Sequence, residues 1–499
     1  MRNDVLIVGG GLAGLTAGVA LAGAGRRVRL LEQKAHLGGR ARSFTDPATG
    51  CVVDNGQHLF MGCYHATLRF LAEIGTLDRV RFQPRLAVWF LEREGRSSSL
   101  VCPDLPAPWH LFAGVLRSAS FTLRQKLEIL RLGRALGSGN GSAPPERLTV
   151  DEWLSRLGQS ETLRRNFWDL LSIAALNEDP RIASASLFDR VLRLALLTSP
   201  EDSRLGLAVT GLSDCYTLAA RDYIRARGGT VETSRSVSSF LIAPGRGGPL
   251  RPSRSPSPWE PISHGSSASP REQREPACPR GVGVCEGVKL AGGEEIEART
   301  VLSAVPCFQF VELLPGDVLR SEPFFERILA LQPAPIISIN LWFDRPVTDL
   351  DFAGLRGTSV QWLFNKGQIL EGAPGRLKEA GRTTGAAAPG WKGYVSLVVS
   401  GARAHIERSR EDLQELALRE LRELLPRARE AKLVHALVIK ERFATFSPRA
   451  DAEDARPEAL TPVRGLYLAG DWTSTGLPAT IEGAVKSGYT AAEAILDGG

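Results

Sequence analysis

The sequence of 499 residues is poor in lysine, has two methionines, and has cysteines that follow no metal-binding or disulfide pattern. Nine of its 61 basic residues are lysines. Because the arginines are spread along the whole chain, the net charge of +6 does not indicate a nucleic-acid surface. The seven cysteines form neither a CxxC pair nor a cluster with histidine, which argues against a metal site and against a disulfide framework. Such a scattered set is typical of reduced thiols, and we therefore expect a cytoplasmic protein.

Long hydrophobic runs are also missing, with one exception at residues 5–25. A run of this length raises the question of a signal peptide or a membrane span. Its glycines argue against both, because residues 5–8 predict a short buried strand and residues 15–24 predict a helix of small residues. A second strand is expected at 28–31. No other apolar run has membrane length, so we expect the protein not to be integral to a membrane.

The turn between the first strand and the helix has the pattern Gly-x-Gly-x-x-Gly, and Glu32 follows the second strand. Gly9 permits a tight turn, Gly11 lets the backbone approach a pyrophosphate, and Gly14 lets the helix pack closely on the strand. The helix N-terminus offers free N–H groups to the phosphates, and Glu32 accepts the ribose hydroxyls of an adenosine. The sequence thus predicts a dinucleotide site formed by Gly9, Gly11, Leu12, Ala13, Gly14, Glu32 and Gln33.

A glycine doublet followed by arginine, Gly38-Gly39-Arg40, comes shortly after Glu32. Arginine suits a pyrophosphate because its guanidinium is a fixed cation with several donors. With this doublet the sequence resembles the flavoprotein superfamily of amine oxidases, phytoene desaturases and Rab GDP-dissociation inhibitors. The resemblance implies that Gly39 and Arg40 contact the phosphates of FAD.

The C-terminal part resembles the second FAD motif of the same superfamily. A strand at 465–471 ends in Gly470 and Asp471, and a small-residue helix opens at Thr480 and Ile481. The resemblance implies that Asp471 binds the ribityl or phosphate region and that the helix N-terminus points at the flavin pyrimidine ring. A helix dipole aimed there favours the anionic reduced flavin. A dehydrogenase that binds only NAD has no need of this second motif.

The predicted fold is α/β, with a glutathione-reductase-like, FAD-binding Rossmann domain interleaved with an α+β substrate domain. Residues 228–237 predict a strand pair, residues 282–290 and 295–299 a β-hairpin, and residues 301–305 a buried strand. By the resemblance, the position of Val237 contacts the adenine. The expected division assigns 1–60, 226–307 and 441–499 to the FAD-binding domain, and 61–225 and 308–440 to the substrate domain.

Two stretches interrupt this division. Residues 243–280 hold nine of the 31 prolines and six arginines against three glutamates, which predicts a disordered insertion in the β-meander. Residues 366–390 are rich in glycine and alanine, and we expect them to form a second loop insertion. Neither stretch has a pattern of catalytic residues.

Residues 52–64 are the most distinctive part of the sequence. The string Asp-Asn-Gly-Gln-His at 54–58, with Gly-Cys-Tyr after it, resembles the hydroxysqualene dehydroxylases, also described as squalene-associated FAD-dependent desaturases. Residues 470–484 fit the same family. The resemblance implies an enzyme that reduces hydroxysqualene to squalene in hopanoid biosynthesis, with Gly56 and Gln57 beside the flavin.

The implied reaction needs a proton donor. Hydroxysqualene is an allylic alcohol, so a general acid protonates the leaving hydroxyl, water departs, and hydride from the reduced flavin reaches the allylic centre. His58 is the first candidate because histidine titrates near neutral pH, and Asp54 and Glu482 are the alternatives. His58 also suits a purely hydrogen-bonding role. No second nucleotide fingerprint is present, so either NADPH binds transiently or another carrier supplies the electrons.

A triterpene dissolves in membranes, so we expect an apolar approach to the bilayer. Residues 108–116 are apolar and aromatic, and five basic residues follow between 117 and 134, with Glu128 as the acid among them. This pattern is typical of an interfacial anchor to anionic lipid, here on the inner face of the cytoplasmic membrane, and equally of a domain helix with a solvated arginine face. Three aromatic residues either line an apolar tunnel or belong to the core: Trp153, Phe167 and Trp168.

Three other functions fit parts of the pattern. A carotenoid desaturase of the phytoene type would use the same flavin site in the opposite redox direction, and the residues leave that direction open. An amine oxidase needs an aromatic cage for its amine, which we cannot place here. A non-enzymatic prenyl-lipid carrier, resembling the GDP-dissociation inhibitors, has no need of an intact FAD motif set. The oligomeric state stays open at this level.

Overall fold

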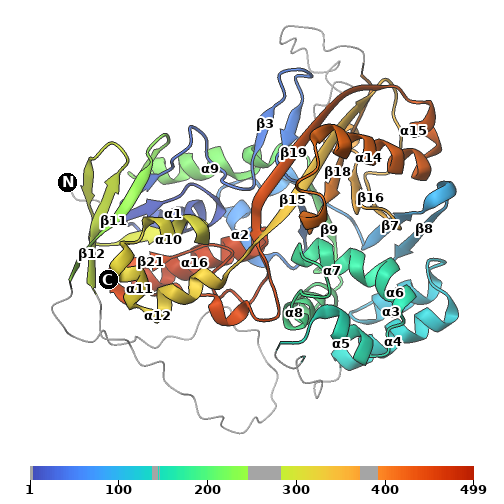
Figure 1. Ribbon diagram of the computed structural model, residues 1–499, viewed down its shortest axis with the longest axis horizontal. Coiled ribbons are helices and arrows are strands. Elements are labelled where there is room, and N and C mark those ends of the chain that lie inside the picture. Colours follow the sequence, from blue (N-terminus) through green and yellow to red (C-terminus); the bar gives the residue numbers. More distant parts are fainter. Residues whose placement is uncertain (1–3, 138–143, 145–146, 245–282, 371–390, 499) are drawn as a thin grey trace.

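A five-stranded parallel sheet lies at the centre of the nucleotide-binding part, with the strand order β10–β2–β1–β14–β21 (Figure 1). The computed structural model describes residues 4–137, 144, 147–244, 283–370 and 391–498. β1 is fully buried in the middle of the sheet because its four residues, VLIV, are all apolar. The strands are β1 (Val5–Val8), β2 (Val28–Leu31), β10 (Thr230–Glu232), β14 (Val301–Ser303) and β21 (Leu466–Leu468).

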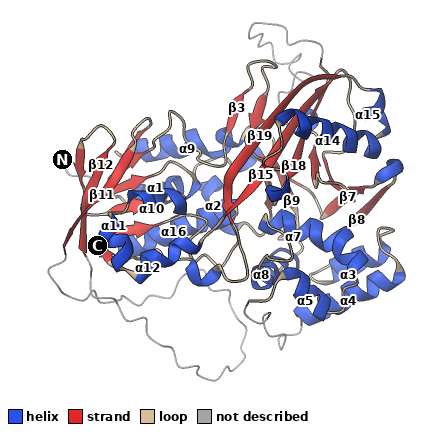
Figure 2. Ribbon diagram, viewed as in Figure 1, coloured by secondary structure: helices blue, strands red, loops and turns tan. Residues whose placement is uncertain are grey.

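Helices α1 and α16 pack against each other next to this sheet (Figure 2). A Cβ at Gly488 of α16 would lie 2.5 Å from the backbone oxygen of Ala13 in α1, so this close approach needs glycine. Gly18 of α1 similarly makes room for Ile224 of α9, whose Cδ1 would lie 2.8 Å from a Cβ there. The helices of this part are α1 (Leu12–Gly23), α2 (His65–Glu73), α9 (Leu212–Ala226) and α16 (Ile481–Gly498).

A small antiparallel sheet carries the predicted β-hairpin, and β20 adds to it in parallel. The prediction of a strand pair at 228–237 is wrong as a pair. β10 joins the parallel sheet beside β2, whereas β11 pairs with β12. The strands are β11 (Val237–Pro244), β12 (Gly283–Leu290), β13 (Glu295–Glu297) and β20 (Val463–Arg464), and the helices that follow the meander are α10 (Cys307–Leu313), α11 (Gly316–Ser321) and α12 (Pro323–Glu326).

The second large sheet has seven strands in the order β19–β15–β18–β17–β16–β7–β8. Its two longest strands, β15 and β19, run from the nucleotide-binding part into this sheet (Figure 1), and α14 packs against both. The elements are β7 (Ala87–Leu91), β8 (Ser97–Val101), β15 (Pro333–Phe343), β16 (Phe352–Leu355), β17 (Trp362–Phe364), β18 (Gly393–Val399), β19 (Leu433–Phe446), α13 (Lys366–Ile369), α14 (Arg410–Leu424) and α15 (Pro426–Glu430).

A helical layer and two small sheets complete the described part. The helices are α3 (Trp109–Arg117), α4 (Leu123–Gly137), α5 (Val150–Arg156), α6 (Glu161–Leu163), α7 (Asp169–Leu176) and α8 (Ala185–Leu196), with a π-helix at Arg164–Trp168. Short 3-10 helices occur at Leu77–Arg79, Arg93–Gly95, Arg327–Ala330, Ala402–Ala404 and Glu453–Ala455. The small sheets are β3 (Ser43–Thr45) with β4 (Val52–Asp54), and β5 (Leu59–Met61) and β6 (Val80–Phe82) on either side of β9 (Leu205–Ala208).

The structure places three segments differently from the expected domain division. α9 packs on α1, although 61–225 was expected to belong to the substrate domain. α10 also belongs to the nucleotide-binding side, because the Phe310 ring contacts Phe240 at 5.8 Å and Trp472 at 5.7 Å between centroids. The expected boundary at 440–441 falls inside the continuous strand β19. The domain to which each of these segments belongs is therefore set by its tertiary packing and not by its position in the chain.

The expected insertions overlap only partly with described residues. Of the stretch 243–280, Ala243 and Pro244 end β11, and the remainder lies outside the described residues. Of the stretch 366–390, residues 371–390 lie outside them. The expectation of a loop is wrong at its beginning, since residues 366–369 form helix α13 and Lys366 is buried.

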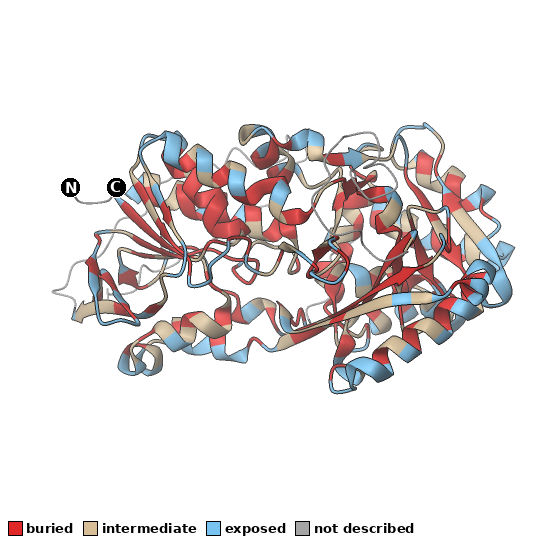
Figure 3. Cartoon of the chain, turned by 90° about the horizontal axis from the view of Figure 1, so that it is seen from above, coloured by how far each residue is buried: buried red, intermediate tan, exposed pale blue. Residues whose placement is uncertain are grey.

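Buried residues concentrate on the sheets and on the inner faces of the helices (Figure 3). The six cysteines among the described residues are free thiols, five of them buried. Among the described helices, none combines the length and the hydropathy that a membrane span requires.

Candidate functional site

A cavity of about 1290 Å³ joins the nucleotide-binding part to the helical layer. Its polar end is lined by the turn after β1 and the loop after β21. Its apolar arm is lined by side chains of α3, α4, α7 and α8. Sixteen of the seventeen predicted site residues line this cavity, and Gly14 is the exception. The structure therefore brings together motifs from both ends of the chain, while each predicted contact with a cofactor stays a prediction.

The three glycines of the first motif occupy three different environments. Gly9 has a φ of +110°, and a Cβ there would lie 2.8 Å from the oxygen of Ala304. A Cβ on Gly14 would lie 2.0 Å from the oxygen of Gly9, so this residue serves close packing of α1 on the turn. Gly11 faces the cavity, and its nearest neighbour is the Cα of Gly39, 3.9 Å from the Cβ position. Backbone at Gly11 is thus open to a large ligand.

Glu32 lies at the adjacent edge of the cavity and is 6% exposed. Its Oε2 accepts a hydrogen bond from the Gly10 amide at 2.8 Å, and its Oε1 accepts one from the Lys34 amide at 2.9 Å. These bonds fix the orientation of the carboxylate while each oxygen retains acceptor capacity. Gln33 and Val237 also line the cavity.

Arg40 and Asp471 join the two FAD-like motifs. Nη2 of Arg40 lies 2.5 Å from Oδ1 of Asp471, across 431 residues of sequence. Burial lowers the pKa of Arg40, but the neighbouring Asp471 carboxylate outweighs that effect, so the pKa is raised. Nη1 also donates to the oxygen of Ala444 at 3.0 Å. The guanidinium predicted to meet a phosphate is therefore held in place and charged.

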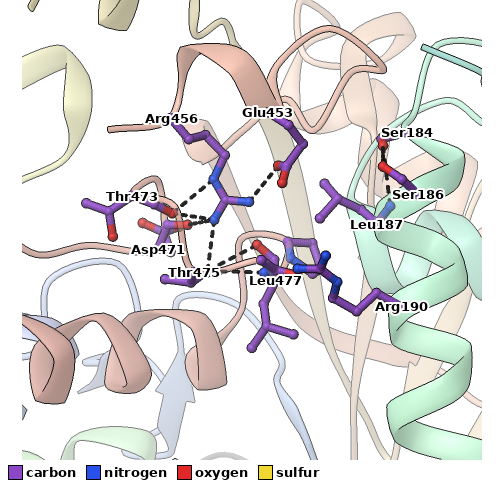
Figure 4. A network of polar contacts seen from close by, with 12 residues as sticks. Ser184, Ser186, Leu187, Arg190, Glu453, Arg456, Asp471, Thr473, Thr475 and Leu477 are labelled. Atoms are coloured by element: carbon purple, nitrogen blue, oxygen red, sulfur yellow. Dashed lines mark hydrogen bonds and ion pairs between the residues drawn. The ribbon is translucent and has the colours of Figure 1, made fainter. Parts of the chain in front are cut away.

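A buried arginine, Arg456, organises the loop that contains Asp471 (Figure 4). Its guanidinium donates to the backbone oxygens of Asp471 at 3.1 Å and Thr473 at 2.5 and 3.0 Å, and to Oγ1 of Thr475 at 2.8 Å. Glu453 balances the charge, with 2.7 Å between its Oε1 and Nη1 of Arg456. One side chain thus satisfies two carbonyls and one hydroxyl of a loop that lines the cavity.

A second arginine, Arg190 of α8, contacts the same loop from the helical layer (Figure 4). Its Nη1 donates to the oxygen of Gly476 at 2.9 Å. α8 begins after Ser184, whose Oγ accepts from the Leu187 amide at 3.3 Å and lies 2.9 Å from Oγ of Ser186. The helix that lines the apolar arm is therefore tied to the loop at the polar end.

The segment after β4 is cross-linked to the glycine-doublet loop by Asn55. Oδ1 of Asn55 accepts from the Arg42 amide at 3.0 Å, and its Nδ2 donates to the oxygen of Arg40 at 3.0 Å. Gly56 and Gln57 then line the cavity. Oε1 of Gln57 is buried and has no hydrogen-bond partner among the described residues. An acceptor left unpaired in this way fits a ligand that brings its own N–H or O–H donor.

His58 lines the cavity immediately beyond Gln57. Burial lowers the pKa of its imidazole below the ordinary value of 6.5; the Asp54 carboxylate opposes this shift and the Lys366 ammonium adds to it. The ring is therefore neutral at neutral pH. This weakens the predicted role of His58 as a proton donor at that pH and favours a donor role under acidic conditions.

Asp54, one of the alternative acids, is occupied by structural partners. Its Oδ2 lies 2.8 Å from Nζ of Lys366, and its Oδ1 accepts from the Leu212 amide at 3.0 Å. The two charged side chains are 4% and 1% exposed. Asp54 is not among the residues that line the cavity. The pair joins β4 to α13 and the start of α9.

Glu482, the other alternative, lines the cavity but also caps helix α2. Its carboxylate accepts from the amides of Ala66 and Thr67, both at 2.9 Å, and from Oγ1 of Thr67 at 2.7 Å. A carboxylate at a helix N-terminus satisfies amides that have no partner within the helix. Burial raises the pKa of Glu482, and these hydrogen bonds lower it by less.

Two of the three aromatic residues that were expected either in an apolar tunnel or in the core line the cavity. Phe167 and Trp168 line the cavity, whereas Trp153 is buried in the core, with its ring 6.4 Å from that of Phe188. Nε1 of Trp168 donates to Oε1 of Gln159 at 2.9 Å, so the indole has a polar partner away from solvent. The arm thus presents a largely apolar surface.

Three residues that were not predicted from the sequence hold this site together: Asn55, Arg456 and Lys366. Asn55 belongs to a distinctive string, but nothing in that string indicates a cross-link to the doublet loop. Arg456 is one arginine among many, and Lys366 opens a glycine- and alanine-rich stretch that reads as a loop. Asp54, the partner of Lys366, lies 312 residues away, and no recognisable local pattern identifies the nearer partners of Asn55 and Arg456.

The model of the family described as flavin containing amine oxidoreductase matches residues 12–242 and 281–496. The chain belongs to this family. It is 28% identical to a hydroxysqualene dehydroxylase of Rhodopseudomonas palustris, with 100% of both chains covered, and 24% identical to a 15-cis-phytoene desaturase of Synechococcus elongatus, with 99% of this chain and 95% of the relative covered.

A solved oxidoreductase from Methanosarcina mazei has the same fold, with a TM-score of 0.68 at 16% identity; 99% of this chain and 100% of that chain are covered. The predicted interleaved α/β fold is confirmed, and so is the resemblance to hydroxysqualene dehydroxylases as a similarity. As a member of the family, this protein is an FAD-dependent oxidoreductase, as predicted.

The residues present fit FAD. α1 begins after Gly11 with no side chain capping its N-terminus, which leaves amides to bind a pyrophosphate. The open backbone at Gly11 leaves room for the phosphates, and the unpaired Oε1 of Gln57 suits an N–H of the flavin. Arg40, held by Asp471, supplies a fixed positive charge.

Proposed function

We propose that this protein catalyses the reductive dehydroxylation of hydroxysqualene to squalene in hopanoid or related triterpene biosynthesis. The observation that carries the proposal is the lining of the cavity. The residues that α3, α4 and α7 contribute to its wall are all apolar or glycine, and the same cavity is lined by residues of the predicted FAD site. Such an arm suits a long hydrocarbon, and the polar end leaves donors and acceptors for one hydroxyl.

The reaction replaces a C–O bond by a C–H bond. The allylic hydroxyl takes a proton and leaves as water, and the allylic carbon takes a hydride, so the substrate gains two electrons. Reduced FAD, when bound, supplies that hydride. The apolar wall excludes bulk water from the allylic centre. The proton for the leaving oxygen comes from His58 in its protonated form or from Glu482, whose pKa is raised by burial.

Relatives named hydroxysqualene dehydroxylase support this assignment, since they match over nearly the full length of both chains. A phytoene-type desaturase is the second candidate. Relatives with that name match to a similar extent, and a long polyene would occupy the same arm. The two functions differ in redox direction: the dehydroxylase oxidises reduced flavin, whereas the desaturase reduces oxidised flavin. An experiment that follows the flavin distinguishes them.

The decisive experiment starts from the purified protein reduced anaerobically with dithionite, which replaces the physiological reductant, be it NADPH or another carrier. Addition of hydroxysqualene should restore the visible absorbance of the oxidised flavin, and extraction should yield squalene in equal amount. If the flavin stays reduced with hydroxysqualene, and phytoene or squalene instead bleaches the oxidised protein, the desaturase is correct and our proposal is wrong.

Two controls test whether the reaction depends on the cavity. A variant with Ala226→Trp, at the exposed end of α9 and outside the cavity lining, should reoxidise at the rate of the unaltered protein. Free FAD reduced under the same conditions should give no squalene. Squalene formed by free FAD alone would contradict a role for the cavity.

A further inference from the structure

Helices α3 and α4 carry apolar residues on two opposite sides. On the inner side, residues such as Val115 and Leu132 are buried and line the cavity. On the outer side, four large apolar side chains are exposed, and we call them the outer apolar patch: Trp109 is 63% exposed, Leu116 55%, Leu123 70% and Leu127 56%.

This clustering is unusual for the molecule. Of the thirteen exposed large hydrophobic residues in the described part of the chain, six fall between positions 101 and 127. Scattered single apolar residues are normal on a protein surface, whereas a group on two consecutive helices marks an interaction surface. Val101 and Leu105, which are 37% and 40% exposed, precede the outer apolar patch in sequence.

The patch is continuous with the cavity through an aromatic pair. The rings of Trp109 and Phe112 lie 5.6 Å apart between centroids. Phe112 lines the cavity and packs on Gly133 of α4, where a Cβ would lie 3.4 Å from its ring. The exposed ring of Trp109 therefore contacts a side chain that lines the cavity.

Basic side chains surround the patch. Arg117, Arg131 and Arg134 are exposed, and Nζ of Lys126 donates to the oxygen of Leu116 at 2.7 Å, beside the patch itself. The acidic residues of the two helices and the preceding loop are the exposed Asp104 and the buried Glu128. Glu128 bonds to Oγ of Ser160 at 2.7 Å and pairs with Arg124, so it does not offset the surface charge.

We propose that the outer apolar patch and its basic border dock onto an anionic lipid bilayer, with α3 and the start of α4 lying in the interface. An apolar face with a basic border is the pattern of an interfacial helix, since apolar side chains partition into the acyl boundary while arginines and lysines meet anionic headgroups. The lipid-soluble substrate comes from the proposed function, and docking places its bilayer reservoir against the cavity. The protein is then peripheral on the inner face of the cytoplasmic membrane.

The test measures flotation of the FAD-loaded protein with vesicles of phosphatidylcholine containing a third phosphatidylglycerol, without substrate. The unaltered protein should bind these vesicles and bind pure phosphatidylcholine vesicles more weakly. A double variant with Leu123→Ser and Leu127→Ser should reduce the partition coefficient about tenfold or more. Raising the salt concentration should weaken binding to the anionic vesicles, because it screens the basic border.

A matched double variant, Leu218→Ser with Leu329→Ser, removes two exposed leucines elsewhere, 49% and 51% exposed, and should bind like the unaltered protein. Retained flavin absorbance and the same melting temperature will show that each variant is folded. A third variant, Trp109→Phe, should lose most of the tryptophan quenching that brominated lipids cause in the unaltered protein.

Three results would overturn the proposal: no binding to anionic vesicles, equal loss in the patch and control variants, or a dimer that the patch substitutions dissociate in the absence of vesicle binding. The last would mean that the patch joins two copies of this chain. Because flotation needs no turnover, vesicle binding by a protein that fails to convert hydroxysqualene would sustain the docking surface and reject only the proposed reaction.

Discussion

Asp54 and Lys366 form a buried ion pair close to His58, and their partnership leads to a stability prediction. Lys366→Met should lower the free energy of unfolding by about 3–5 kcal/mol, because it leaves the Asp54 carboxylate buried without a cation. The combined variant Asp54→Asn with Lys366→Met should recover much of that loss. Denaturant unfolding of the FAD-loaded protein measures both. If Lys366→Met and the double variant were equally stable, the unpaired Asp54 carboxylate would not be the cause of the loss.

His58 leads to a prediction about pH at the same scale. Because burial lowers its pKa below 6.5, the protonated imidazole is populated only under acidic conditions. If His58 donates the proton, kcat/KM for dehydroxylation should therefore fall as the pH rises through that lowered pKa. His58→Gln should reduce kcat by about 10²–10⁴-fold and flatten this limb of the profile. An unchanged profile in the variant would assign the proton to another group, such as Glu482 or a bound water.

At the scale of elements, the contact between α1 and α16 depends on glycine. Gly488→Ala would place a Cβ 2.5 Å from the oxygen of Ala13, and the helices must separate to accept it. We expect a loss of about 1–3 kcal/mol in the free energy of unfolding and weaker retention of FAD. Thermal unfolding and the flavin-to-protein absorbance ratio report the two effects.

The control for this substitution lies at the end of α4. A Cβ on Gly137 meets nothing within 4 Å, so Gly137→Ala should be neutral or stabilise by up to about 1 kcal/mol. Similar losses in both variants would mean that alanine itself, rather than the contact between α1 and α16, is the cause.

At the scale of the whole molecule, the polar end and the apolar arm form one cavity. Ala175 of α7 lines the arm and is partly buried. Ala175→Trp should obstruct the arm and lower kcat/KM for the triterpene by at least tenfold, because the hydrocarbon no longer fits. FAD content should stay unchanged. Steady-state kinetics check the prediction, with Ala226→Trp as the surface control; a parallel loss of FAD would place the effect at the polar end.

The cofactor-binding framework follows from local sequence patterns. Strand, glycine turn, helix and Glu32 follow one another within about thirty residues, so local patterns of hydrophobicity and glycine suffice to place them. The same is true of the strand and helix around Asp471, because a short buried strand and a small-residue helix are recognisable without their neighbours. The resemblance to FAD enzymes then predicted which cofactor the framework binds.

The distant residues that support this framework are identified by the folded chain and not by local patterns. Lys366 meets Asp54 across 312 residues and Arg40 meets Asp471 across 431, and such pairs arise from the interleaving of chain segments that no local period reveals. Folding also placed α9 beside α1, and gave α3 and α4 one face toward the cavity and one toward solvent. A run of apolar residues in sequence predicts that a helix buries them. Which face stays exposed depends on what packs against it.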